Sequence, residues 1–446
     1  MKGQLAVLPL VCAALFAQMP IPDLLKDAAA RAPMHLEQFQ QFALATNPTL
    51  QQANALVKES AAEARQAGLL PNPVIGYRGE EIRGGEFGGG EQGGFLQQTF
   101  ILGGKLRLRR NIYEQQRRAD EIGAAEQRYR VLGGVSQSFY RALASQAIVN
   151  VRRRLLALAM DAVETAHQLA NVGQADVPDV LQAEVESEQA KVDYTSAQRD
   201  FIQAFHSLSA LAGKPDLPVS GLQGDLEHPP EINPDEAMDK IAQSSPMVQR
   251  ARQDIVRAEA EVQSAKRETV PDLQVTAGAQ QSYEALNDFN NKPVGFQGFV
   301  TAGISLPVFN RNQGNIAAAQ ADLERARAEV SRVQLSLRQR AQTLLQAYLS
   351  SEMEAARYKT EMIPRARRAY ELYLAKYRQM GAAYPQVLVS QRTLFQIQVG
   401  YVHALENVWV DAIALQNYTL TSGLNAPALS GVYSTTLNAP NPSGAQ

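Results

Sequence analysis

The chain has 446 residues, with 43 Lys and Arg against 45 Asp and Glu, and 45% of its residues are hydrophobic. This balanced charge argues against a nucleic-acid binder, which usually carries a basic excess. Mean hydropathy is −0.25 and no apolar run approaches the ~18–20 residues of a spanning helix, which excludes a polytopic helical membrane protein. A single cysteine excludes a disulfide framework and a zinc site built from several thiolates.

The amino terminus predicts a secretory signal peptide. Lys2 precedes an apolar stretch from Leu5 to Phe16, small residues follow, and we expect cleavage near Ala17, so that residues 1–17 are removed. A buried N-terminal strand or helix is the alternative. The one cysteine, Cys12, follows Val11 rather than a small residue, which argues against lipidation.

An internal duplication organises the chain, and its matched positions lie about 200 residues apart. They are Asn47-Pro48 with Ser245-Pro246, Pro71 with Pro271, Tyr140 with Tyr348, Gly173 with Gly381, Val180-Leu181 with Val387-Leu388, and Gly213 with Gly423. We expect a first repeat at residues 34–222, a linker at 223–234, a second repeat at 235–423 and a disordered tail at 424–446.

Each repeat is predicted to end in a very long helical hairpin, at residues 104–212 and 313–422. In the second, apolar residues recur from Ile316 to Leu337 in alternating steps of three and four, the seam of a coiled coil. No proline occurs between Pro73 and Pro178, which predicts one helix from Lys105 to Val172 and a partner over 177–211. The counterpart runs from about 314 to 380 with a kink at Pro364, and then from 386 to 420.

Strand-like segments lie only between these helices, at residues 74–78, 95–101, 273–280 and 296–306. They predict β-hairpins at about 73–102 and 272–308, and the glycine-rich stretch 84–94 is interpreted as a turn. Four strands cannot close a barrel, for which about eight is the lower limit. Three chains would supply twelve, within the range of outer-membrane barrels.

No catalytic motif is convincing, so we expect no enzyme and no cofactor. Glu164 and His167 have the spacing of a di-iron ligand pair, but the repeat equivalent of Glu164 is Leu372, which favours a solvated helix face. The glycine-rich stretch lacks a phosphate-binding loop, and Gly103-Gly104-Lys105 lacks the required earlier glycine. Ser, His and Asp are too scattered for a triad.

The turns between the long helices run from Gly173 to Asp179 and from Gly381 to Gln386. A glycine at a helix end, followed by an acidic or proline-containing start, is ordinary capping chemistry, so each can be a tight turn and nothing more. Turns at the ends of long hairpins also commonly carry contacts, which makes a functional tip the other interpretation.

These features together resemble the TolC-like outer-membrane factors of bacterial efflux and secretion systems. The resemblance rests on the duplication, on Pro71-Asn72-Pro73 and Pro271 before the strands, on the run from Ile304 through Ala319, and on the Gly-x-x-x-x-x-Asp-Val-Leu turn at Gly173. It covers about residues 34–423. The run from Ser305 to Ala319 is most similar to the heavy-metal branch, of the cobalt-zinc-cadmium and copper-silver type.

The resemblance implies a mainly α fold with a small β part. Long coiled-coil hairpins would form a trimeric α-barrel in the periplasm, and four strands per protomer would contribute to a twelve-stranded β-barrel in outer-membrane lipid. The homotrimer would be a passive duct that meets a periplasmic adaptor and an inner-membrane pump, often of the resistance-nodulation-division type. Its cargo would be metal ions or small toxic compounds, and no nucleic-acid partner is expected.

Two sets of site residues follow from the resemblance. The tip, gate and adaptor-contact residues would be Gly173, Asp176, Asp179, Val180, Leu181, Gly381, Tyr384, Gln386, Val387 and Leu388. The strand–helix junctions would be Pro71, Pro73, Pro271, Pro307 and Asn310. Family members often place Asp before Val-Leu in both tips and use an Asp ring as a cation-selective constriction; Asp179 keeps that position, whereas the second tip has Gln386. We therefore expect Asp176 and Asp179 to form the carboxylate constriction.

Two other classes of function are open from the residues. A pore-less periplasmic coiled-coil adaptor or scaffold explains the heptads and the signal peptide, but not the paired strands at matching places in both repeats. A helical carboxylate-metal enzyme would need more ligands than Glu164 and His167 supply.

Overall fold

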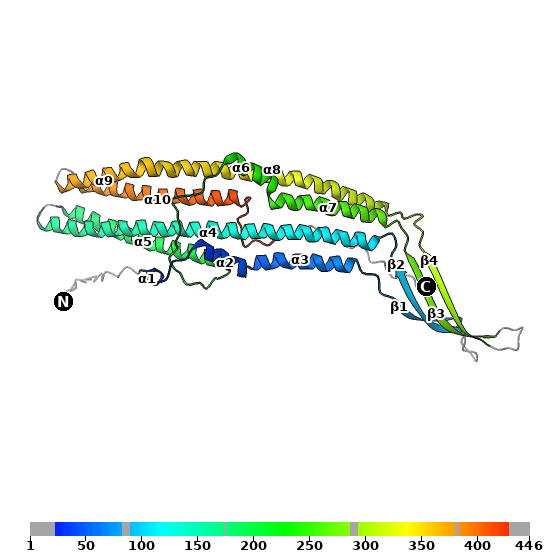
Figure 1. Ribbon diagram of the computed structural model, residues 1–446. Helices are drawn as coiled ribbons and strands as arrows, with labels where there is room; N and C mark the ends of the chain where they lie inside the picture. Colours follow the sequence, from blue (N-terminus) through cyan, green and yellow to red (C-terminus); the bar gives the residue numbers. More distant parts are fainter. Residues whose placement is uncertain (1–22, 83–89, 174, 286–292, 380–382, 428–446) are drawn as a thin grey trace, which may run out of the picture.

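The computed structural model describes residues 23–82, 90–173, 175–285, 293–379 and 383–427. Helices lie side by side along a long rod; the four-stranded sheet lies at one end, and the start of α5 and the end of α9 lie at the other (Figure 1). The predicted signal peptide, most of the predicted tail and Gly381 fall outside the described residues.

The described residues of the first half form five helices and two strands, and the longest of these helices extends along the rod. These elements are α1 (Lys26–Ala29), α2 (Leu36–Thr46), α3 (Pro48–Ala67), β1 (Val74–Glu80), β2 (Glu91–Phe100), α4 (Lys105–Asn171) and α5 (Val177–Leu211). The prediction of one unbroken helix across residues 105–172 is confirmed by α4. Its 67 residues span about 100 Å at ~1.5 Å per residue.

The second half repeats the order of helices, hairpin and long helical hairpin. Its elements are α6 (Pro234–Ser244), α7 (Pro246–Arg267), β3 (Leu273–Ala285), β4 (Pro293–Ile304), α8 (Gln313–Arg357), a π-helical turn (Tyr358–Met362), α9 (Ile363–Arg378) and α10 (Tyr384–Gln416). No helix in the described part of the chain meets the combined demands of length, hydrophobicity and low charge for crossing a membrane.

Equivalent helices begin with equivalent local devices. The side chains of Asn47 and Ser245 each accept a hydrogen bond from the backbone N–H two residues on, and a proline opens each helix. Gly104 and Asn312, which are 208 residues apart, both take left-handed backbone conformations (φ 70° and 58°) just before α4 and α8. These two residue types tolerate that conformation best, so the duplication extends to the backbone.

At the predicted kink near Pro364, the helix contains a π-helical turn, which shifts the register of its hydrogen bonds. The N–H of Ile363 bonds to the carbonyl of Tyr358, five residues back, which is the π-helical pattern. Proline has no N–H to donate to the carbonyl of Thr360, so a regular helix would leave that group unpaired within the helix. The wider turn separates α8 from α9.

The predicted end of the last long helix, at residue 420, is wrong: α10 ends at Gln416. Tyr418 and Thr419 take positive φ values of 56° and 65°, and the N–H of Thr419 bonds to the carbonyl of Ala414 at 2.8 Å. The chain therefore leaves the helix by a left-handed turn and crosses α4. Gly423, the repeat counterpart of Gly213, lies beyond this helix and against Val131 of α4.

Two large apolar clusters hold the rod together, one in each half. The first centres on Phe39, Phe139 and Phe205, and the second on Leu337 and Tyr348, all of which are fully buried or nearly so. Aromatic rings join the halves where α4 meets α10: the rings of Tyr140 and Trp409 stack with centroids 3.6 Å apart.

The predicted linker packs against the helices of the second half. Trp409 donates its ring N–H to the carbonyl of Leu226, and Glu227 accepts a hydrogen bond from Tyr401 and pairs with Lys359 at 2.9 Å. These contacts place the segment between the repeats across the middle of the rod.

The strands form one antiparallel sheet in the order β1-β2-β3-β4. The interpretation of residues 84–94 as a turn is wrong for its last four residues, because Glu91 to Gly94 begin β2 and pair with β1 and β3. β2 and β3 approach so closely at Gly93 that only glycine fits there: a Cβ would lie 2.2 Å from the carbonyl oxygen of Ala279.

Candidate functional site

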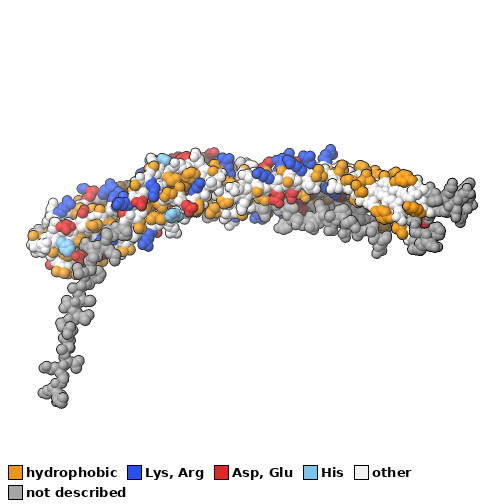
Figure 2. Space-filling view, turned by 90° about the horizontal axis from the view of Figure 1, so that it is seen from below, with side chains coloured by type: hydrophobic (Ala, Val, Ile, Leu, Met, Phe, Trp, Pro, Cys, Tyr) orange, Lys and Arg blue, Asp and Glu red, His pale blue; other side chains and the backbone are white. Residues whose placement is uncertain are grey.

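The sheet presents one apolar face. Ile75, Leu96, Ala277 and Val300 form one row across the four strands, so their side chains point to the same side. Other apolar members of this face are Tyr77, Phe100, Leu273, Val275, Ala279, Phe296, Ala302 and Ile304. Ile75, Phe296 and Val300 are 81%, 77% and 76% exposed, and hydrophobic side chains gather over this end of the molecule (Figure 2). An apolar patch of this extent marks a contact surface for lipid or protein.

The opposite face of the sheet is mostly polar. Its polar side chains are Arg78, Glu80, Glu91, Gln97, Thr99, Gln274, Thr276, Gln280, Ser282, Gln297 and Thr301. Arg78 on β1 reaches toward β4, where its guanidinium carbon lies 4.8 Å from the ring centroid of Phe299. Since β2 and β3 lie between these strands, both side chains lie along the sheet surface.

The five predicted junction residues all lie between a strand and a helix. Pro73 directly precedes β1, Pro271 precedes β3, and Pro307 follows β4. The carbonyl of Pro71 accepts a hydrogen bond from Gln98 of β2 at 3.0 Å. The side chain of Asn310 accepts one from the N–H of the left-handed Asn312, also at 3.0 Å, which helps to form the turn into α8.

Ion pairs at the same junction join the two halves. Lys105, at the start of α4, is buried, and its Nζ lies 2.6 Å from Asp272 Oδ1 and 2.9 Å from the carbonyl oxygen of Val270. Arg109 pairs with Glu268 at 2.8 Å one turn further on. The sheet is therefore anchored to the rod by charge pairs between α4 and the segment after α7.

At the far end of the rod, the first predicted tip is an exposed acidic turn. Gly173 has a φ of 73° and no atom near the position of a Cβ, so the turn requires its backbone conformation. Asp176 is exposed and opens α5, and its carbonyl accepts the N–H of Asp179 at 3.0 Å. The structure thus brings Asp176 and Asp179 onto one helical turn.

The described part of the second predicted tip contains one buried aromatic residue, Tyr384. Tyr384 packs in a cluster with Ala166 and Ala183 of the first hairpin, and Val180 and Leu388 pack against that cluster. Val387 is also buried, whereas Leu181 and Gln386 are exposed. Of the predicted tip residues, Val180, Tyr384 and Leu388 therefore hold the two hairpins together.

Three further residues at this end were not predicted. Tyr377 packs on Tyr384 with ring centroids 5.6 Å apart, and Arg392 of α10 pairs with Glu186 of α5. Burial raises the pKa of Tyr384 to about 12, and the nearby charge of Asp179 adds to this shift. The seven-residue spacing of tyrosines from Tyr370 through 377 to 384 is the signal that could have identified the aromatic pair.

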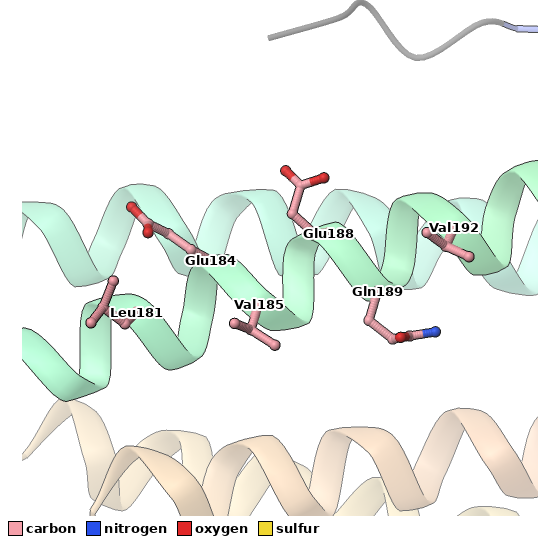
Figure 3. A pocket seen from close by; sticks show the side chains of 6 residues that line it. All are labelled: Leu181, Glu184, Val185, Glu188, Gln189 and Val192. Carbon is pink, nitrogen blue, oxygen red and sulfur yellow. The ribbon is translucent and has the colours of Figure 1, made fainter. Parts of the chain in front are cut away.

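An exposed apolar stripe runs along α5 from the tip. Val177, Leu181, Val185 and Val192 are each 55–70% exposed and follow helical spacing. Leu181, Val185 and Val192 line an open groove with Glu184, Glu188 and Gln189 (Figure 3). On the adjacent hairpin, α9 contains no buried residue. Both helices therefore have faces suited to another chain.

Glu164 and His167 do not form a metal site with each other. His167 of α4 instead lies 3.2 Å from Glu184 of α5, in an exposed pair between the two helices of the hairpin. The described residues contain no group of three or more His, Cys, Asp or Glu placed to hold a metal ion.

Sequence comparison identifies the family. The profile of the outer membrane efflux proteins matches residues 40–214 and 237–419, one segment in each repeat. The chain belongs to the outer membrane efflux protein family. As a member of it, the protein resides in the outer membrane, with its long helices in the periplasm.

Individual relatives agree with this assignment. The cobalt-zinc-cadmium resistance protein CzcC of Cupriavidus metallidurans is 26% identical over 395 residues, which cover 89% of this chain and 91% of CzcC. The nickel-cobalt-cadmium resistance protein NccC of Alcaligenes xylosoxydans xylosoxydans is 26% identical over 69% of this chain and 68% of its own. The predicted similarity of this outer membrane efflux protein to the heavy-metal branch is confirmed.

Solved structures share the fold. The structure of CusC superimposes with a TM-score of 0.72 at 19% sequence identity, covering 91% of this chain and 97% of CusC. The predicted fold class, mainly helical with a small four-stranded part, is thereby confirmed for this outer membrane efflux protein.

Proposed function

We propose that three copies of this chain form the exit duct of a tripartite efflux system. The duct is a passive conduit from the periplasm to the outside, without chemistry or energy input of its own. The observation that carries the proposal is the sheet with one apolar and one polar face, attached to the end of a helical rod about 100 Å long.

The two faces of the sheet support a lipid-facing and a water-facing surface. Transmembrane barrels alternate apolar residues outward and polar residues inward along each strand, as this sheet does. Four strands per chain leave both edges open, whereas three chains supply twelve strands that close on themselves.

Exposed faces on the helices support the same stoichiometry. In the described part of the chain, nothing covers the apolar stripe on α5, and α9, although it packs on α10, has no buried residue. In a trimer, α5 and α9 of neighbouring copies would cover these faces and complete a ring of helices.

The tips are proposed to close the duct at rest and to meet a periplasmic adaptor coupled to an inner-membrane pump. Three copies would bring three pairs of Asp176 and Asp179 around one axis, an acidic constriction that favours cations. Opening would move the α9–α10 hairpin against the α4–α5 hairpin, and would separate the contacts of Tyr384 and the Arg392–Glu186 pair.

The cargo is proposed to be divalent metal ions, because CzcC and NccC, which match 89% and 69% of the chain, are named as metal-resistance proteins. Deletion of the gene should sensitise cells to cobalt, zinc or cadmium, and the wild-type chain should restore resistance. Sensitivity to organic toxicants alone would instead assign small organic compounds as the cargo.

Channel recordings test the duct itself. Purified protein in planar bilayers should conduct, and Asp176→Ala with Asp179→Ala should raise the closed-state conductance and lower the preference for cations. Gln386→Ala, at the equivalent place in the second tip, is the matched control. Unchanged conductance and selectivity in the double variant would place the gate elsewhere, and a protein that never conducts would contradict the duct.

A further inference from the structure

The polar face of the sheet contains two glycine–phenylalanine pairs in one row. Gly76 of β1 pairs with Phe95 of β2, which pairs with Gly278 of β3, which pairs with Phe299 of β4. The two glycines are 202 residues apart and the two phenylalanines 204, so each repeat contributes one pair. Phenylalanine is unexpected on a face that is otherwise mostly polar, and its recurrence in both repeats requires a reason.

Each phenylalanine ring occupies the space that a side chain on its glycine would fill. A Cβ on Gly76 would lie 2.5 Å from Cζ of Phe95, and a Cβ on Gly278 would lie 2.5 Å from Cζ of Phe299. Both rings are half-buried and therefore lie flat against the sheet. The guanidinium of Arg78 lies over the Phe299 ring and pairs with Glu80 at 2.5 Å, which keeps a third side chain along the same surface.

We propose that the Gly76–Phe95 and Gly278–Phe299 pairs are specificity-determining residues that set the width of the lumen within the sheet. The absence of a Cβ at each glycine lets the adjacent ring lie on the wall rather than project into the path of the solute. This inference rests on the proposed duct, in which the polar face lines the lumen.

The geometry of a closed barrel places these rings in two tiers. Phe95 and Phe299 are two strands apart, about 10 Å at ~4.8 Å per strand. With strands tilted by about 40°, this separation corresponds to roughly 6 Å along the barrel axis. Three copies would give three Phe95 rings at one height and three Phe299 rings at another, so a solute passes two successive aromatic tiers.

Accessibility of a single introduced cysteine tests the inference independently of the tip. Gln274 lies on the polar face, nearer to the helices than the aromatic row, so Gln274→Cys reports what passes that row from outside the cell. Intact cells would be treated with N-ethylmaleimide or with a maleimide carrying a polyethylene glycol chain. The chain without this substitution gives the background, and labelling is compared at equal amounts of protein in the outer-membrane fraction.

Gly76→Val should push the Phe95 ring into the lumen, because the three atoms nearest to the added Cβ all belong to that ring. The large reagent should then label Gln274→Cys about tenfold more slowly, with little change for the small one, since pore diameter limits passage. Adding Phe95→Ala should restore the rate. Gly94→Val is the matched control: it adds the same side chain to the same hairpin on the apolar face, where a Cβ meets only a carbonyl oxygen at 3.7 Å.

Several results would overturn the inference: unchanged labelling in Gly76→Val, equal slowing in Gly94→Val, or failure of Phe95→Ala to restore the rate. A different labelling result would contradict the proposed duct itself. If N-ethylmaleimide labels Val300→Cys on the apolar face but not Gln274→Cys, the polar face is not a lumen, and the proposed function falls together with the inference.

Discussion

Replacing two adjacent glycines in the middle of α4 by alanine should destabilise the protein, although alanine has the higher helix propensity. Gly133 and Gly134 lie where the segment after α10 crosses α4. A Cβ on Gly133 would lie 2.5 Å from the carbonyl oxygen of Leu420, and a Cβ on Gly134 would lie 2.6 Å from that of Thr421. These contacts are with backbone atoms, which cannot turn aside as a flexible side chain can.

The magnitude follows from two competing effects. Replacing glycine by alanine inside a helix stabilises it by about 1 kcal/mol. Each contact would have to open by roughly 1 Å to reach ordinary van der Waals distance, and such overpacking costs about 1–3 kcal/mol. We expect Gly133→Ala with Gly134→Ala to destabilise the protein by about 2 kcal/mol in total, which lowers the Tm by about 2 °C for a chain of this length.

Thermal unfolding followed by circular dichroism of the helices in detergent would measure this effect. Gly123→Ala on the same helix is the control, because a Cβ there meets only the side chain of Arg250 at 3.9 Å, and it should raise the Tm slightly. If the double variant at Gly133 and Gly134 is as stable as Gly123→Ala, the close crossing of the last segment over α4 is wrong.

Three further predictions concern charges in the rod. Asp272→Ala should destabilise the strand–helix junction by about 2 kcal/mol in denaturant unfolding, because it removes the 2.6 Å partner of the buried Lys105; a change below 0.5 kcal/mol would show that the pair is no anchor. Burial raises the pKa of Tyr384 to about 12, so the free energy of unfolding should fall as pH rises from about 10 to about 12, by up to about 3 kcal/mol. Tyr384→Phe should lose this part of the pH dependence, and an identical pH profile in both proteins would argue against the burial of its hydroxyl. Burial also raises the pKa of Asp411 to about 6, although the nearby charge of Arg141 opposes this shift. The free energy of unfolding should therefore fall as pH rises from about 4 to about 6. Asp411→Asn should remove this fall and be more stable at pH 7 by about 2–3 kcal/mol, and equal stability of the two proteins at pH 7 would refute the shift.

Much of the architecture was predictable because it depends on local periodicity. Heptad spacing and the absence of proline predicted α4 and α5 to within a residue. The strand-like segment at residues 296–306 likewise predicted most of β4. These signals come from side chains that meet a neighbouring element at every turn or every second residue, so they are visible in a single sequence.

The errors share a physical origin, since each depends on backbone geometry or on contacts between distant segments. The register change before Pro364 is one of several ways a helix can accommodate proline. Glycines such as Gly93 suggested a turn, but close approach of β3 makes glycine necessary within the strand. The pairing of Arg392 with Glu186 connects residues 206 apart, and no spacing along one helix could indicate it.

The two tips show how the duplication has diverged where function would be concentrated. The first tip exposes Asp176 and carries Asp179 on the same turn, whereas the second buries Tyr384 against the first hairpin. A duplicated tip would give a trimer six similar turns around the axis. In the proposed trimer, divergence would instead give three acidic turns, each supported by a neighbouring turn that contains Tyr384. Loosening the contacts of Tyr384 would then free an acidic turn, so within this arrangement a single packing contact couples the position of the charge to the opening of the hairpins.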